Sequence, residues 1–466
     1  MYFPGLIFKQ VRVSSSLDPS PQQAHKSPPG QPRNKSKLGC RECKAKRVKC
    51  DEVYPTCRRC QRQGLVCSSA PRPTQWQVET PWLSLQPKTH VNPRLLQYWL
   101  EKVSQASVVD PENNPFSFPL LEHVAQSPAL VHAIQSVSAS HERHFPAKAP
   151  ILALEERGKA IACLRSEMNQ IQRAPYTHFL TIMLLALAHV ADSDPKEYGE
   201  QHLLGARALI NSMLGDISSI SMSTTNDPVV RLCLGIYLYW DMCSSFLADP
   251  YEPQGLDSLN ISLAVQRMGD WHHPMYGTCS RLLLIIANVG RYCRQIHDMP
   301  QTRNPTREAL LEAQLCTWET SPPNPDLGHL YEAFRNHGLV FLYRSRVHAQ
   351  RRCCTDPGLA EAQDESLILQ HAEETIRHLL LIPASSNSLN FQSLPLLATG
   401  SELTASNGSL RNEVRGRLRA IYSLNRLPTN LMALRLVEEL WDARDNGNPS
   451  FWLSRTLQKG WRLLLT

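Results

Sequence analysis

The sequence contains no apolar run long enough to cross a membrane. Its most apolar stretch, residues 179–191, includes Thr181 and His189 and is much shorter than the roughly 20 residues that a membrane-spanning helix needs. Residues 1–8 are too short for the apolar core of a secretion signal, and no basic residues precede them. We therefore expect a chain that is neither secreted nor membrane-spanning, and we interpret residues 179–191 as a buried helix.

The sequence also lacks the short motifs of common enzyme classes. It has no phosphate-binding loop, dinucleotide fingerprint or nucleophile elbow. His141 and His144 flank Glu142 at the wrong interval, because a metalloprotease helix carries its histidines four residues apart. The adjacent His272 and His273 are interpreted as surface histidines of a loop. These absences predict a protein that is not an enzyme.

Cysteine, in contrast, is concentrated in one short segment. Six cysteines form two copies of one spacing, Cys-x2-Cys-x6-Cys, and the copies are offset by 17 residues: Cys40, Cys43 and Cys50, then Cys57, Cys60 and Cys67. Two tetrahedral zinc ions need eight ligand positions, so six thiolates suffice only if two of them bridge both metals. The repeat nominates the leading cysteine of each copy, Cys40 and Cys57, as the bridges. Cys43 and Cys50 then complete one site, and Cys60 and Cys67 the other.

A disulfide framework is the alternative use of these six cysteines. It is disfavoured because closely spaced pairs suit one metal ion better than long-range bridges, and because no secretion signal is recognised. The other cysteines show no such pairing and are interpreted mostly as small core residues: Cys163, Cys233, Cys243, Cys279, Cys293, Cys316, Cys353 and Cys354.

Positive charge is concentrated in the same segment. Residues 33–62 hold eleven basic and three acidic side chains, a formal charge of +8, whereas the whole chain carries +7. The rest of the chain therefore sums to −1, and the basic character is local. Two zinc ions with six thiolates remove about two charges and leave a strongly cationic unit, which is typical of nucleic-acid binding.

Only the first cysteine copy carries this charge between its second and third cysteines. We predict a short helix that begins near Glu42 and presents Lys46 and Arg47 to base edges, with Lys44 and Lys49 toward the phosphate backbone. Lysine and arginine donate to guanine O6 and N7, so a G-rich element is expected. A solvated basic surface, a non-specific nucleic-acid or RNA binder and a cytosolic zinc enzyme remain as alternatives.

The segment from Cys40 to Cys67 resembles the binuclear zinc cluster of fungal transcription factors. The resemblance implies two zinc ions, docking in the major groove of double-stranded DNA, and recognition of CGG-like triplets through Lys46 and Arg47. It also implies a nuclear protein that works with the transcription machinery on RNA polymerase II genes. The basic run from Lys44 to Lys49 would then also suit a nuclear import signal.

The rest of the chain predicts an all-α protein with a second, larger domain. We expect a disordered tail over residues 1–35, the cluster over 36–70, a flexible proline-rich linker over 71–91 and a large α-helical regulatory domain over 92–466. A cap residue followed by proline predicts five helix starts, at Asn92-Pro93, Ser127-Pro128, Asp194-Pro195, Asp227-Pro228 and Asn304-Pro305. Apolar periodicity predicts further helices, over residues 151–172, 178–191, 228–247, 327–351 and 359–382.

This larger region resembles the fungal-specific transcription factor domain. The resemblance rests on Asn114-Pro115-Phe116, Leu130 to Ile134, His202 to Ile210 and Leu440-Trp441-Asp442, among other short segments. It implies a regulatory role, a homodimer as a partner state, and control of a metabolic or secondary-metabolite gene set. No heptad repeat that would set a dimer spacing follows the cysteine cluster.

Overall fold

The computed structural model describes most of the cysteine cluster and most of the region that follows it. The described residues are 39–53, 56–68, 90–142, 151–169, 175–191, 196, 198–215, 220–249, 258–353 and 359–465. The predicted tail and nearly all of the predicted linker lie outside these ranges. The expected all-α class is confirmed, because the described residues form helices and no β-strand, with one isolated bridge between His273 and Gly277.

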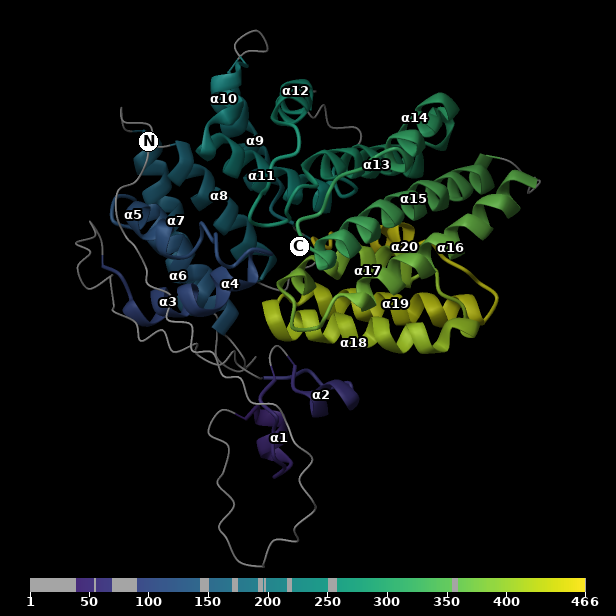
Figure 1. Ribbon diagram of the computed structural model, residues 1–466, viewed down its shortest axis with the longest axis horizontal. Coiled ribbons are helices and arrows are strands. Elements are labelled where there is room, and N and C mark those ends of the chain that lie inside the picture. Colours follow the sequence, from purple (N-terminus) through teal and green to yellow (C-terminus); the bar gives the residue numbers. More distant parts are fainter. Residues whose placement is uncertain are drawn as a thin grey trace, which may run out of the picture. The chain divides into compact units, whose positions relative to one another are not determined.

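The helices fall into a short pair and two larger groups along the sequence (Figure 1). The pair lies in the cysteine segment: α1 (Arg41–Ala45) and α2 (Arg58–Arg62). The first group covers residues 93–268: α3 (Pro93–Tyr98), η2 (Trp99–Val103), α4 (Ser104–Ala106), η3 (Phe118–Leu120), α5 (Leu121–Val124), α6 (Pro128–Glu142), α7 (Ile151–Met168), α8 (Pro175–Val190), α9 (Glu200–Leu214), α10 (Met222–Asn226), α11 (Pro228–Ser244) and α12 (Ser258–Met268).

The second group covers residues 280–458 and packs on the first through α13, which contacts both α11 and α15. Its elements are α13 (Ser280–Asp298), η5 (Pro300–Thr302), α14 (Pro305–Cys316), α15 (Pro325–Cys353), α16 (Leu359–Leu381), η6 (Asn387–Gln392), α17 (Ser393–Gly400), η7 (Ala405–Asn407), α18 (Gly408–Asn425), α19 (Thr429–Asp445) and α20 (Trp452–Gln458). The long α15 and α16 pack along each other, as do α18 and α19 (Figure 1).

Four of the five predicted cap-and-proline starts begin helices. The side-chain oxygens of Asn92, Ser127, Asp227 and Asn304 each accept a hydrogen bond from the N–H three residues on, at 3.1–3.4 Å. A proline occupies the next position in each case, where its missing N–H costs nothing. The fifth start, at Asp194, lies outside the described residues.

A continuous hydrophobic core runs through both groups, from Leu96 to Leu465. Residues 179–190 of the apolar stretch belong to α8, where Phe179 and Ala186 are fully buried, which confirms the prediction of a core helix. Within the described residues, none of the helices combines the length and the apolarity needed to cross a membrane.

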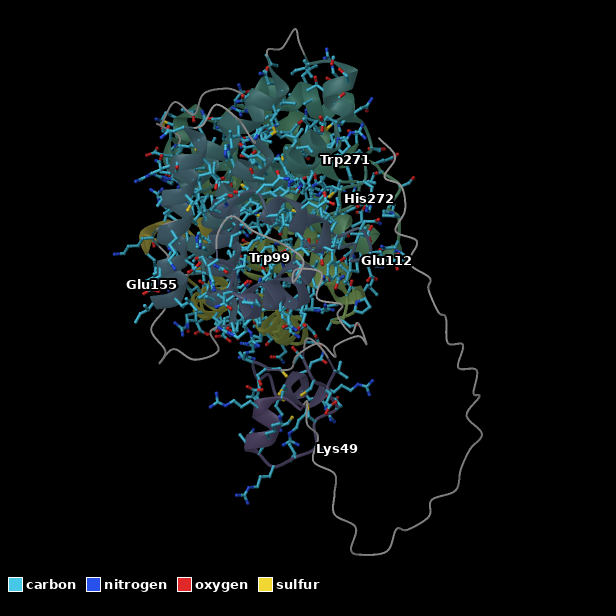
Figure 2. The ribbon with its side chains drawn as sticks, turned by 90° about the vertical axis from the view of Figure 1, so that its left-hand side faces the viewer. Lys49, Trp99, Glu112, Glu155, Trp271 and His272 are labelled. Carbon is cyan, nitrogen blue, oxygen red and sulfur yellow. The ribbon has the colours of Figure 1, made fainter. Side chains whose placement is uncertain are left out.

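The interpretation of His273 as a surface residue is wrong. Its side chain is fully buried, stacks on the ring of Tyr276 at 4.5 Å, and its Nε2 lies 3.2 Å from the carbonyl oxygen of Leu232. Gly235 on α11 makes room for it, because a Cβ there would approach the imidazole to 2.3 Å. Burial lowers the pKa of His273 to about 3. His272 remains partly exposed beside Asp110 (Figure 2).

Buried ion pairs join α15 to the elements that follow it, and the sequence patterns did not predict them. Arg344 donates to Glu365 and Glu402, and Arg444 donates to the same Glu402. The Arg344 and Glu402 side chains are 8% and 1% exposed. A charge buried this deeply is tolerated only while its partner is present, so each side chain depends on the other.

The cysteines outside the cluster follow the expectation in part. Cys233, Cys243, Cys279 and Cys293 are buried, and Cys163 is partly buried, as core residues should be. Cys316 and Cys353 are exposed, because both lie near helix ends, where one face meets solvent. Cys354 lies outside the described residues.

Candidate metal centre and nucleic-acid interface

The two cysteine copies fold into the same local structure. In each copy the leading cysteine sits at the N-cap of a short helix, and its Sγ accepts the N–H of the second cysteine: Cys43 to Cys40 and Cys60 to Cys57, both at 3.4 Å. Beyond each helix the chain turns back, and a backbone N–H donates to the carbonyl oxygen of the second cysteine. Val48 donates to Cys43 at 3.0 Å in the first copy, and Leu65 donates to Cys60 at 2.9 Å in the second. The repeat in the sequence is therefore a repeat in hydrogen bonding.

The six sulfur atoms form two groups of four. One group holds Cys40, Cys43, Cys50 and Cys57, the other holds Cys40, Cys57, Cys60 and Cys67, and all sulfurs within a group lie within 4.8 Å of one another. The predicted bridging pair, Cys40 and Cys57, is the pair common to both groups.

The spacing of the sulfurs suits tetrahedral zinc. Cys40 Sγ lies 3.8 Å from the sulfurs of Cys50, Cys57 and Cys60, and Cys43 Sγ lies 3.7 Å from that of Cys57. Two thiolates on one tetrahedral zinc, each about 2.3 Å from the metal, are separated by about 3.8 Å. These separations match the edges of two such tetrahedra that share two sulfurs.

The six thiols are buried, so their ionised form needs a nearby cation. All six cysteines are at most 4% exposed. Burial raises the pKa of Cys40 and of Cys57, and it raises the pKa of Cys60 to about 11. Burial also acts against ionisation of Cys50, but the N–H groups of Cys40 and Glu52, at 3.5 and 3.3 Å, hold its pKa below the ordinary value. Metal binding must therefore displace the protons of Cys40, Cys57 and Cys60.

Each copy caps the helix of the other, a feature that the sequence analysis missed. Asp51, directly after Cys50, accepts the N–H of Arg58, the first residue of α2, at 3.1 and 3.3 Å. Ser68, directly after Cys67, accepts the N–H of Arg41, the first residue of α1, at 2.7 Å. The signal available in the sequence was the polar residue that directly follows the last cysteine of each copy. The two halves are consequently linked by backbone caps as well as by sulfur.

Ser68 also orders the start of α1 through Glu42. Its N–H and its hydroxyl both donate to the Glu42 carboxylate at 2.8 Å. These bonds hold the pKa of Glu42 below its ordinary value, although burial acts in the opposite direction. Glu42 thereby stays ionised in the first turn of α1, where the helix dipole favours negative charge.

The predicted DNA-contacting side chains lie together on the outside of the first copy. Lys44, Lys46, Arg47 and Lys49 are all exposed, and Figure 2 shows Lys49 at the surface of this unit. The helix begins at Arg41, close to the predicted start, but it ends sooner than the prediction requires.

Only Lys44 of these four is on the helix. Lys46 forms the C-cap of α1, and Arg47 follows it with a positive φ of 54°. The counterpart of Arg47 in the second copy is Gly64, with φ 59°, so the turn demands a left-handed residue in both copies. The cations therefore lie at the end of a helix, in the turn after it and in the segment beyond that turn.

Lys46 also connects the C-terminal ends of the two short helices. Its Nζ donates to Oε1 of Gln63 at 3.2 Å, and Gln63 is the C-cap of α2. Since Gln63 lies 17 residues after Lys46, the pair joins equivalent positions of the two copies. The second copy is thus uncharged where the first is cationic.

Two known families match the chain. The fungal specific transcription factor domain matches residues 94–466, and the fungal Zn(2)-Cys(6) binuclear cluster domain matches residues 38–77. No solved structure matches the chain.

Three curated proteins show the extent of similarity. A Zn(2)-C6 fungal-type transcription factor of Gibberella zeae is 48% identical over 40 residues, which cover 9% of this chain and 8% of that protein. The Zn(2)-C6 fungal-type transcription factor afumD of Aspergillus fumigatus is 29% identical over 122 residues, which cover 21% and 32%. The aspercryptin biosynthesis cluster-specific transcription regulator atnN of Emericella nidulans is 49% identical over 41 residues, which cover 9% and 7%. The matched segments thus span at most about a third of these relatives.

Proposed function

Because the chain belongs to the family of fungal-specific transcription factors and carries its six-cysteine cluster domain, we propose that it is a zinc-dependent DNA-binding regulator of RNA polymerase II genes. The cluster domain of this family binds two zinc ions. Members of the family are transcription factors, so the chain is not an enzyme. We propose a nuclear location, a cluster domain over residues 36–70, a linker over 71–91 and a regulatory domain over 92–466.

The six cysteines of the repeat are the proposed zinc ligands, with Cys40 and Cys57 each bound to both ions. The observation that supports this assignment is the pair of four-sulfur groups that share these two residues. When bound, the two ions would offset the charge of the buried thiolates and lock the two copies together.

Lys46 and Arg47 are the proposed readers of base edges, with Lys44 and Lys49 on the phosphates. The exposure of all four supports this role, as does the position of Lys46, Arg47 and Lys49 beyond the end of α1, which brings several donors to one edge of a rigid unit. Lysine and arginine favour guanine O6 and N7 in the major groove, so we propose CGG-like triplets as the target.

The proposed targets are genes of a metabolic or secondary-metabolite pathway. This proposal is supported by the name of the relative from Emericella nidulans, which describes a regulator specific to a biosynthesis cluster. Double-stranded DNA, the transcription machinery and a second copy of the chain are the proposed partners.

Binding assays with the zinc-loaded chain test the proposed DNA contacts. Lys46→Ala should lose about 1–3 kcal/mol on a CGG duplex and much less on a scrambled one, because a base contact carries sequence information. Lys49→Ala should weaken both duplexes alike and reduce the salt dependence by about one counterion, because a phosphate contact carries none. The control is Gln61→Ala, an exposed residue on α2.

Dissociation constants measured on both duplexes at several salt concentrations separate these roles. Equal relative losses on the two duplexes for both lysine variants would contradict the division between base and phosphate contacts. A wild-type chain with no preference for a CGG duplex over a scrambled one would refute the proposed target.

A further inference from the structure

The helical region contains a cavity of about 90 Å³ that is lined by both groups of helices. Its walls are largely apolar: Val137 of α6, Leu187 of α8 and Tyr239 of α11 come from the first group, and Phe391 of η6 and Leu427 beyond α18 from the second. The rings of Tyr239 and Phe391 meet edge to face at 5.2 Å. One water needs about 10–15 Å³, so the cavity has room for a molecule of several heavy atoms.

Most polar residues around the cavity already have partners. His141 Nε2 lies 3.1 Å from the carbonyl oxygen of Leu424, and Asn390 donates to the carbonyl oxygen of Ala106 at 3.0 Å. Asn425 donates to Oδ1 of Asn390 at 2.9 Å. The first two bonds each join the first helix group to the second, so the cavity is framed by a network that holds the two groups together.

Two lining residues carry donors without a partner. The hydroxyl oxygen of Ser140 and Nε of Arg426 are buried atoms that make no hydrogen bond within the part of the chain that the structure describes. Ser140 is 7% exposed. Buried polar atoms are nearly always satisfied in native proteins, because leaving one unpaired carries its full desolvation cost.

The charge on the cavity lining is positive only. Arg426 is its one permanently charged lining residue, and no aspartate or glutamate lines it. Nη2 of Arg426 donates to the carbonyl oxygen of Cys67 at 3.5 Å, and among the described residues no acidic side chain is paired with this guanidinium. The cavity therefore combines an apolar, aromatic interior with two donors that lack an acceptor, the Ser140 hydroxyl and Nε of Arg426.

We propose that this cavity binds a small, mostly apolar carboxylate. Its hydrocarbon part would lie against Tyr239, Phe391 and Leu427, and its carboxylate would accept hydrogen bonds from the Ser140 hydroxyl and from Arg426. A ligand in this position contacts both helix groups, so its binding biases their arrangement and gives the helical region a means of sensing a metabolite. This inference goes beyond the proposed DNA-binding function and does not depend on it.

Benzoate is a suitable probe, with benzyl alcohol as the uncharged comparison. Binding to the full zinc-loaded chain is measured without DNA, by ligand-observed NMR titration. Ser140→Ala and Arg426→Asn should each weaken benzoate binding by about tenfold, in keeping with the loss of one hydrogen bond to a charged group. Asparagine suits the left-handed backbone of Arg426, whose φ is 59°. Arg435→Asn, which removes an exposed charge on α19, is the matched control and should leave binding unchanged.

A second measurement separates a ligand contact from a structural one. Without the probe, Ser140→Ala should not lower the thermal midpoint, since the hydroxyl that it removes has no partner in the fold. Benzyl alcohol should bind more weakly than benzoate and should not respond to Arg426→Asn. No saturable binding of benzoate, equal benzoate affinity in all variants, or equal affinity of benzoate and benzyl alcohol would overturn the proposal.

Discussion

Asp51→Ala should weaken zinc retention although Asp51 binds no metal. Its carboxylate accepts the N–H of Arg58 at 3.1 and 3.3 Å and so caps α2 from the opposite cysteine copy. Loss of a side chain that accepts a first-turn N–H costs about 1 kcal/mol, as for an N-cap residue. The five-residue α2 cannot absorb that cost by itself, because a helix this short is unstable without outside contacts. Since Cys57 lies at the start of α2 and belongs to both four-sulfur groups, the cost should fall on both metals.

A cost of about 1 kcal/mol corresponds to about a fivefold loss of apparent zinc affinity. Competition against a chromogenic chelator measures it, with the full chain at fixed pH and salt. Asp51→Asn is the matched control: it removes the same charge but keeps a side-chain oxygen that caps nearly as well, so it should retain zinc almost like the wild type. Unchanged zinc affinity in Asp51→Ala, or equal losses in the two variants, would refute the reasoning.

Three further outcomes are expected. The helical region should lose stability as the pH falls below about 6.5, measured as a lower urea midpoint by tryptophan fluorescence. The reason is that burial lowers the pKa of His273 to about 3 and of His337 to about 4, so only the unfolded chain binds those protons; an unchanged midpoint between pH 7.5 and 5 would contradict this. Glu402→Ala should destabilise the fold by about 3–5 kcal/mol in urea unfolding, because it removes the acidic partner of Arg444 and leaves the buried Arg344 paired only with the partly exposed Glu365; a loss below about 1 kcal/mol would contradict it. Cys57→Ser should disturb both zinc ions and Cys67→Ser mainly one, counted by native mass spectrometry; identical zinc counts would exclude Cys57 as a bridge.

The sequence was a good guide to helices with a local start signal. The cap-and-proline pairs at Asn92 and Asp227 begin α3 and α11 because the cap oxygen and the proline act within one turn. The predicted 359–382 and 327–351 helices correspond to α16 and α15 within a few residues. Some helices had neither a recognised start signal nor a predicted apolar period, α13 among them, and were not predicted. Cys279 caps α13 without a side-chain hydrogen bond, so only tertiary packing marks its beginning.

The candidate site was predictable to the extent that it is encoded by spacing. The repeat nominated Cys40 and Cys57, the leading cysteine of each copy, as the shared pair, and these two residues are common to both four-sulfur groups. The exchange of caps through Asp51 and Ser68 was not predicted, since it depends on how the copies face each other. The turn at Arg47 was also missed, because arginine gives no sign of a left-handed backbone, whereas Gly64 does.

The near-symmetry of the cysteine unit separates its framework from its cationic surface. Sulfurs, caps and turns occupy matched positions in the two copies, but the lysines of the first copy are replaced by glutamine or valine at the equivalent positions of the second. Substitution of Lys44 or Lys49 leaves every sulfur and both exchanged caps in place. The charge of this surface is therefore open to change one side chain at a time, while the fold that presents those side chains stays constant.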